Sequence, residues 1–170
     1  MLKNRVQDIL VPLTEYPHIR DTATLRDAFA VLNESYETGK RYRHILVLNA
    51  QGQLVGLIGV RDLLRGVLPD YLRTGELHHF EGGQPDVSSL ALIWQETCET
   101  QCKAVANNPI RGFMGAVPGT VKPDDPITLA AYLMVTHDSS MLPVVDDRQI
   151  IGVVRVIDVF SVACQAVLHD

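Results

Sequence analysis

One sequence pattern occurs twice in this chain, and this internal repeat constrains the fold more than any other feature. Residues 53–64 read QLVGLIGVRDLL, and residues 149–160 read QIIGVVRVIDVF. In both segments the fourth residue is glycine and the tenth is aspartate, Asp62 in the first copy and Asp158 in the second. Self-similarity of this kind indicates two copies of one structural unit. A chain of 170 residues is long enough for two small units that share a core.

Each copy predicts the same order of secondary structure. Apolar residues at helical spacing follow Thr24 and Thr128, and both threonines are predicted to be helix N-caps. Two β-rich runs joined by a tight turn come next, which is typical of a hairpin. A last helix is expected to begin near Asp62 or Asp158. The predicted fold class is therefore α+β, with the order β-α-β-β-α repeated twice, and the extra residues of the first copy, within 34–43, are expected to form a surface loop.

The segment between the copies belongs to neither. We expect repeat 1 to span residues 1–69, a linker to span 70–108, and repeat 2 to span 109–170. Within the linker, a helix is predicted over about 88–106, and one face of it is expected to dock on the repeats. The apolar stripe of this helix consists of Leu90, Ile93, Trp94, Cys98, Cys102 and Val105.

Charge and hydropathy exclude several functional classes. The net charge of −5 argues against broad binding to nucleic acid, which requires a basic face. The basic segment 39–44, GKRYRH, is a local exception; a solvated loop is the simpler interpretation, and a phosphate-facing patch is the alternative. No apolar run has the length of a bilayer span, which predicts no membrane partner. An odd number of cysteines without an export signal predicts a cytoplasmic protein.

These motifs resemble the CBS (cystathionine-β-synthase) domain family, in a tandem pair. The resemblance covers most of residues 4–69 and 109–168. It implies a pseudo-twofold pair of repeats with clefts between them, in which many relatives bind adenosine nucleotides or related adenosyl ligands. It also implies dimerisation of such pairs. The segments that carry the resemblance are 54–64 (LVGLIGVRDLL), 142–146 (LPVVD), 151–158 (IGVVRVID), 6–10 (VQDIL) and 111–114 (RGFM).

The resemblance also implies a binding site at the two motif aspartates, Asp62 and Asp158. A carboxylate at a strand-to-helix junction can accept hydrogen bonds from ribose hydroxyls, and the helix N-terminus favours phosphate. The implied ligand is AMP, ADP, ATP or a related adenosyl compound, with no further cofactor. The candidate ligand-binding residues are Asp158, Arg155, Asp62, Gly59, Pro143 and Leu46, the last two being matched positions in the first hairpin strand of each copy.

The chain departs from the family pattern at one point in each copy. The family has Thr or Ser three residues before the motif aspartate, where this chain has Gly59 and Arg155. Gly59 leaves space, whereas Arg155 could either bind a phosphate or fold onto Asp158 and fill the site itself. If one cleft is occupied, the sequence favours the cleft at Asp158. For both aspartates, capping of the helix is the alternative role.

The sequence also bears on two further site types, a metal site and a catalytic site. Cys98 and Cys102 lie four residues apart, with His78 and His79 upstream, but the cysteines share an apolar stripe and are expected to be core residues rather than metal ligands. No nucleophile, general base and oxyanion-stabilising group occur in a catalytic pattern, so we predict that the chain is not an enzyme.

The sequence therefore predicts a regulatory module that senses an adenosine-type ligand and signals to an effector protein that the residues do not identify. A structural or protein-interaction module without ligand is the alternative. A homodimer is expected in both cases, because the helix predicted over 158–168 is apolar on nearly all sides and has to be covered on more than one face. Burial under the helix predicted over 88–106 is the alternative.

Overall fold

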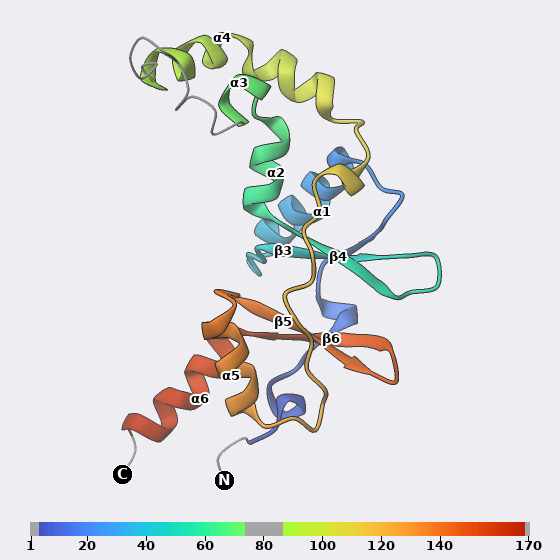
Figure 1. The fold of residues 1–170 in the computed structure, drawn as a ribbon, viewed down its shortest axis with the longest axis vertical. Coiled ribbons are helices and arrows are strands. Elements are labelled where there is room, and N and C mark those ends of the chain that lie inside the picture. The colour runs from blue at the N-terminus through green and yellow to red at the C-terminus, as the bar shows by residue number, and fades with distance from the viewer. Residues whose placement is uncertain (1–3, 74–86, 169–170) are drawn as a thin grey trace.

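The two repeats form two three-stranded sheets that lie one above the other along the long axis of the molecule (Figure 1). A computed structural model describes residues 4–73 and 87–168, so His78 and His79 lie outside the described residues. One sheet has the order β2 (His18–Arg20), β3 (His44–Leu48), β4 (Leu54–Gly59), and the other has the order β1 (Val11–Pro12), β6 (Gln149–Arg155), β5 (Met141–Asp146). The predicted α+β class is confirmed.

In repeat 1, β2 pairs with β3 in parallel, and β3 and β4 form an antiparallel hairpin. Repeat 2 has the same hairpin in β5 and β6, whereas its first strand is reduced to a single parallel bridge between Val121 and Val144. The elements of repeat 1 are β2 (His18–Arg20), α1 (Leu25–Glu37), β3 (His44–Leu48), β4 (Leu54–Gly59) and α2 (Val60–Val67). Those of repeat 2 are α5 (Ile127–Thr136), β5 (Met141–Asp146), β6 (Gln149–Arg155) and α6 (Val156–Leu168).

The first helix of each repeat begins differently. Thr24 caps α1, since its side chain accepts a hydrogen bond from the Asp27 amide and the Asp27 carboxylate accepts one from the Thr24 amide. The prediction that Thr128 caps α5 is wrong, because α5 begins at Ile127 and Pro126 is its N-cap residue. Proline starts this helix without a side-chain cap: its ring restricts φ, and its carbonyl accepts a hydrogen bond from the amide of Leu129 at 3.0 Å.

The extra residues of repeat 1 lengthen a helix as well as a loop. Helix α1 has 13 residues and α5 has 10, so part of the segment expected to be loop continues α1 to Glu37. The remaining loop turns sharply at Gly39, where φ is +78°, and at Arg41, where φ is +50°. This loop leads directly into β3.

The N-terminal segment of each repeat packs on the opposite repeat. A 3₁₀-helix at Val6–Ile9 places Val6, which is fully buried, in the core of repeat 2, and β1 (Val11–Pro12) pairs with β6. Conversely, a 3₁₀-helix at Ile110–Gly112 places Ile110 in the core of repeat 1. The backbone amide of Val6 donates to the carbonyl of Asp125 at 2.9 Å, and that of Ile110 donates to the carbonyl of Ala23 at 3.1 Å. These reciprocal contacts relate the repeats by pseudo-twofold symmetry.

The linker helix expected over about 88–106 is α4 (Val87–Val105), which lies at the end of repeat 1, beside α2 and the short α3 (Asp70–Arg73) (Figure 1). Its C-terminal part docks, with Cys102 and Val105 packed against the core of repeat 1. Ile93 is 55% exposed, so the apolar stripe is not covered along its whole length. Within residues 4–73 and 87–168, no helix is long and apolar enough to cross a membrane.

The thiols of Cys98 and Cys102 lie 3.9 Å apart on α4. Both side chains are half-buried, and burial raises the pKa of the Cys102 thiol, which disfavours the thiolate that metal binding requires. Among the described residues, no group of three or more His, Cys, Asp or Glu side chains is placed to hold a metal ion.

Candidate functional site

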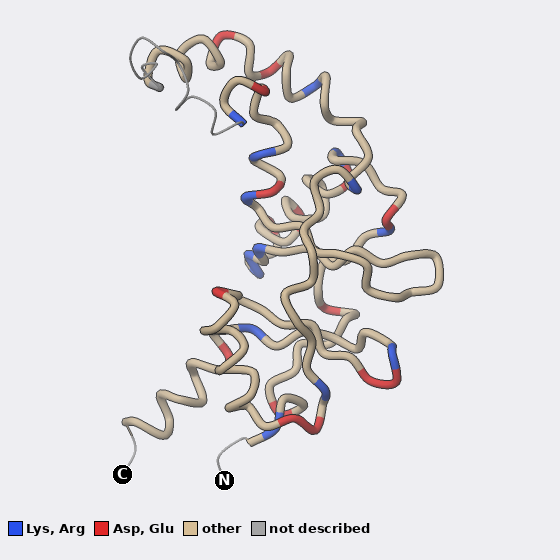
Figure 2. The backbone as a smooth tube through the Cα atoms, in the orientation of Figure 1, with Lys and Arg blue, Asp and Glu red and all other residues tan. Residues whose placement is uncertain are grey.

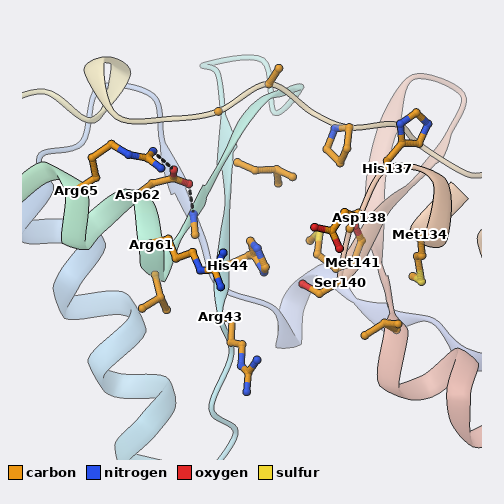
Figure 3. A pocket seen from close by; sticks show the side chains of 18 of the residues that line it. Arg43, His44, Arg61, Asp62, Arg65, Met134, His137, Asp138, Ser140 and Met141 are labelled. Carbon is orange, nitrogen blue, oxygen red and sulfur yellow. Dashed lines mark hydrogen bonds and ion pairs between the residues drawn. The ribbon is translucent and has the colours of Figure 1, made fainter. Parts of the chain in front are cut away.

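A cleft of about 1030 Å³ opens between the two repeats (Figure 3). Repeat 1 contributes the junction between β4 and α2 and the start of β3. Repeat 2 contributes the end of α5 and the start of β5, and the segment that joins the repeats forms a third wall. Among the lining residues are Arg43, His44, Gly59, Arg61, Asp62, Arg65, Pro118, Asp138, Ser139 and Met141. We call this cavity the open cleft.

Asp62 lies on the first turn of α2, at the repeat 1 wall of the open cleft. Its Oδ2 accepts a hydrogen bond from the Gly59 amide at 2.8 Å, and its Oδ1 accepts one from Nη1 of Arg65 at 2.9 Å. The carboxylate therefore caps the helix, which is the alternative role that the sequence allowed. Each carboxylate oxygen can accept a second hydrogen bond, and the side chain is 26% exposed. Asp62 can thus cap α2 and still bind a hydroxyl group in the cleft.

The repeat 1 wall of the open cleft carries a surplus of positive charge. Arg43, Arg61 and Arg65 line this wall together with Asp62, and the second carboxylate of the cleft, Asp138, lies on the opposite wall. Arg65 is paired with Asp62, whereas Arg43 and Arg61 have no ion pair within the described part of the chain. Figure 2 shows basic positions gathered along α2 and at the start of β3. In a chain whose net charge is −5, this local excess favours an anionic ligand.

His44 stands at the base of this wall, where β3 begins. It pairs with Gly59 across the β3–β4 ladder and faces the cleft (Figure 3). Burial lowers the pKa of the His44 imidazole; the carboxylate of Asp62 opposes this effect, and the guanidinium of Arg43 adds to it. Arg43 and His44, which end the basic segment 39–44, both line the open cleft; Arg43 is exposed and His44 is half-buried.

Around Asp158 the arrangement is different. Arg155 forms a bidentate ion pair with Asp158, with Nε–Oδ2 and Nη2–Oδ1 distances of 2.6 and 2.8 Å. The guanidinium carbon lies 6.0 Å from the ring centre of Tyr42, which comes from repeat 1. The Tyr42 ring in turn packs on Tyr16, with ring centres 4.8 Å apart. We call these four residues the closed site.

Both tyrosines of the closed site are buried. Tyr16 is 4% exposed and Tyr42 is 9% exposed. Burial raises the pKa of Tyr16 far above its ordinary value, so the phenol stays neutral. The side chains of Arg155 and Asp158 are 33% and 23% exposed, which places the ion pair at the edge of this aromatic cluster.

The open cleft and the closed site are related by the pseudo-twofold symmetry, and at three matched positions the closed site has the larger residue. Gly59 corresponds to Arg155 in the repeat motif. Ser139 and Tyr42 each lie two residues before a matched strand, β5 or β3. Pro118 lies three residues before Val121, which bridges Val144 on β5. Tyr16 lies three residues before Ile19, which pairs with Val47 on β3. The matched pairs are Gly59 and Arg155, Ser139 and Tyr42, and Pro118 and Tyr16.

The candidate residues from the sequence are therefore divided between several places. Asp62 and Gly59 line the open cleft, whereas Arg155 and Asp158 bind each other in the closed site. Leu46 is fully buried in the core of repeat 1, and Pro143 is buried on β5 opposite Val153. The preference of the sequence for the cleft at Asp158 stays a prediction.

Sequence reasoning did not single out Arg61, Arg65, Asp138 or Ser139 as site residues. Arg61 and Arg65 could have been predicted from the sequence, since they lie within one turn of the motif aspartate on the helix that begins there. Asp138 and Ser139 could not have been predicted in this way, because only the packing of repeat 2 against repeat 1 brings the end of α5 to this cleft.

Comparison with known proteins identifies the family. The CBS domain model matches residues 6–69 and 110–164, so the chain belongs to the CBS domain family and contains a tandem CBS pair, as the motifs predicted. Proteins of this family are typically regulatory rather than catalytic. None of the curated proteins compared with the chain matches it.

Several solved structures share the fold. CBSX2 in complex with AMP is 21% identical, with a TM-score of 0.64 and coverage of 96% of this chain and 98% of that chain. A CBS domain-containing protein from Bacillus anthracis is 17% identical, with a TM-score of 0.70 and coverage of 98% and 96%. The cytosolic domain of the Mg²⁺ channel MgtE in complex with ATP is 20% identical, with a TM-score of 0.64 and coverage of 95% of this chain and 50% of that chain.

Proposed function

We propose that this protein is a regulatory module that senses an adenosine-type nucleotide in the open cleft. The observation that carries the proposal is the combination, in one cavity, of the motif aspartate Asp62 with Arg43 and Arg61, two cations that form no ion pair with any residue in 4–73 or 87–168. Two proteins of the same fold, CBSX2 and the cytosolic domain of MgtE, were crystallised with AMP and ATP, which supports this class of ligand. The module acts in the cytoplasm and passes its signal to an effector protein.

The residues suggest how such a ligand is held. Asp62 accepts hydrogen bonds from the ribose hydroxyls, and Arg43 and Arg61 neutralise the phosphate groups. The opposite wall, at Asp138 and Ser139, belongs to repeat 2. Because the cleft is lined by both repeats, a ligand that binds one relative packing of the repeats more tightly shifts the protein toward that packing.

Thermal unfolding with AMP, ADP, ATP, NAD and S-adenosylmethionine tests the proposal. A ligand at one hundred times its Kd stabilises the folded chain by about 2.7 kcal/mol, which raises the Tm by roughly 5–10 °C for a chain of this size. Asp62→Ala should abolish the shift, and the matched variant Asp158→Ala should keep it. Each variant is compared with its own ligand-free Tm, which separates loss of binding from loss of stability.

If no ligand of this panel shifts the Tm at millimolar concentration, the sensing function is refuted. A shift that survives in Asp62→Ala and disappears in Asp158→Ala would instead place the ligand at the closed site.

A protein-interaction role is the second candidate, and exposed apolar side chains on α5 and α6 favour it. Tyr132 and Val135 on α5 are 64% and 83% exposed, and Phe160 on α6 is 61% exposed. The two helices contact each other, so these side chains lie on neighbouring elements. A second copy of the chain packed on this face would form the homodimer. Sedimentation should then detect a dimer that Phe160→Glu dissociates, and a wild-type monomer at all concentrations would contradict it.

A further inference from the structure

The closed site has the same arrangement of strand, helix and motif aspartate as the open cleft, but the side chains of Arg155 and Tyr42 lie beside its aspartate. Both oxygens of Asp158 are bound by the guanidinium of Arg155, whereas in the open cleft the Gly59 amide and Arg65 bind Asp62. Gly59 has no side chain to reach its aspartate. The difference between the two repeats therefore begins with one residue, three positions before the motif aspartate.

Two tyrosines, Tyr42 and Tyr16, occupy the rest of the closed site. The Tyr42 ring lies beside the guanidinium of Arg155, and Tyr16 packs behind Tyr42. At the matched positions the open cleft has Ser139 and Pro118, which are smaller. A planar cation beside an aromatic ring is a favourable arrangement, which holds Arg155 in place. In the closed site, the guanidinium of Arg155 therefore lies against both oxygens of Asp158, where a ribose would have to bind, and the Tyr42 ring lies beside it.

Resting on the proposed function, we infer that each chain carries one working nucleotide site and one latent site, and that residues 155 and 42 keep the latent site closed. The wild-type chain binds one adenosine nucleotide, at Asp62. Arg155→Gly, which introduces the residue that repeat 1 has at the matched position 59, removes the guanidinium from both oxygens of Asp158. Replacing Tyr42 with the matched serine removes the ring beside it.

The reverse exchange closes the open cleft. A Cβ atom on Gly59 would lie 3.2 Å from Cδ2 of His44 and 3.4 Å from Oδ2 of Asp62. Both neighbours are side-chain atoms that can shift slightly, and the backbone φ of Gly59 is −93°, which any residue adopts. An arginine there can reach Asp62 as Arg155 reaches Asp158. Gly59→Arg is therefore expected to fold and to weaken nucleotide binding roughly tenfold or more, the equivalent of one hydrogen bond to a charged group.

Isothermal titration calorimetry with AMP and with ATP measures the number of sites directly. We expect a stoichiometry of one per chain for the wild type and two per chain for Arg155→Gly/Tyr42→Ser. Arg155→Gly alone is the milder variant, for use if the double variant does not fold, as judged by circular dichroism. Adding Asp62→Ala to either variant should leave one site per chain, which assigns the second site to Asp158.

Two sites in the wild type, or one site in the folded double variant, would refute the inference and leave the proposed function intact. Binding by the double variant but not by the wild type would support the latent site and refute the proposed function. Absence of binding by both proteins would refute both.

Discussion

Gly152→Ala is expected to separate the N-terminal segment from repeat 2, because the backbone of β1 passes directly over this glycine. A Cβ atom at position 152 would lie 2.2 Å from the carbonyl oxygen of Val11 and 2.8 Å from a methyl carbon of Leu10. The nearest atom belongs to the backbone of β1, which pairs with β6 at this point. The clash cannot be relieved by a side-chain rotation, so β1 has to move away from the sheet.

The magnitude follows from what this movement disrupts. Overpacking of a well-packed contact typically costs about 1–3 kcal/mol. If β1 detaches, Val6 also leaves the core of repeat 2, where it is fully buried, at a cost of about 1.5–3 kcal/mol. Together these terms lower the free energy of unfolding by about 2.5–6 kcal/mol, which corresponds to a fall in Tm of at least about 5 °C.

Gly56→Ala is the matched control at the equivalent position of repeat 1. Its Cβ atom would meet Sδ of Met114 at 2.8 Å and the carbonyl oxygen of Gly115 at 3.2 Å. The closest atom here is part of a flexible side chain, which can move. Thermal and urea unfolding of both variants, followed by circular dichroism, should show the larger loss in Gly152→Ala. An equal or smaller loss in Gly152→Ala than in Gly56→Ala would refute the argument that the backbone contact with Val11 requires glycine.

Two further predictions concern stability. Thr24→Ala removes the capping box of α1 and should lower the free energy of unfolding by about 1 kcal/mol. Thr128→Ala should change it by less than about 0.5 kcal/mol, because Thr128 is not a cap. Urea unfolding of the two variants measures this difference. Burial lowers the pKa of the His44 imidazole in the folded chain. As the pH falls below the ordinary value of 6.5, His44 therefore becomes protonated in the unfolded chain before it does so in the folded chain. Stability should therefore decrease from there down to the lower pKa of the folded state, and His44→Gln should make this decrease smaller in unfolding experiments at several pH values; an unchanged pH dependence would contradict the assignment.

Much of the fold could be predicted because it depends on local pattern. The helix at Thr24 follows from a capping residue and apolar spacing, and the two hairpins follow from β-rich runs separated by turns. The wrong prediction at Thr128 has a local cause as well, since Pro126 begins the helix in a way that a threonine pattern does not reveal. The repeat itself predicted two related units, and the CBS domain match agrees with it.

The candidate site could be predicted only in part. The motif marks Asp62 and Asp158 equally, and the one local difference, Gly59 against Arg155, allowed Arg155 either to bind a phosphate or to fold onto Asp158. Arg155 was recognised as a residue that could fill the site, but Tyr42 was not, because it belongs to the other repeat. The same is true of Asp138 and Ser139, which meet Asp62 only across the boundary between repeats.

The sequence by itself determined the repeated unit, the order of its helices and strands, and the two motif aspartates, since periodicity, capping and turn chemistry act between residues that are close along the chain. The tertiary structure alone decided that the lead-in segments at Val6 and Ile110 exchange between repeats and that the cleft at Asp62 stays open. Both outcomes depend on contacts between residues far apart in sequence, such as Val11 with Gly152 and Tyr42 with Arg155. The physical reason is that burial and steric fit are properties of the packed molecule, in which each repeat provides part of the other's surroundings.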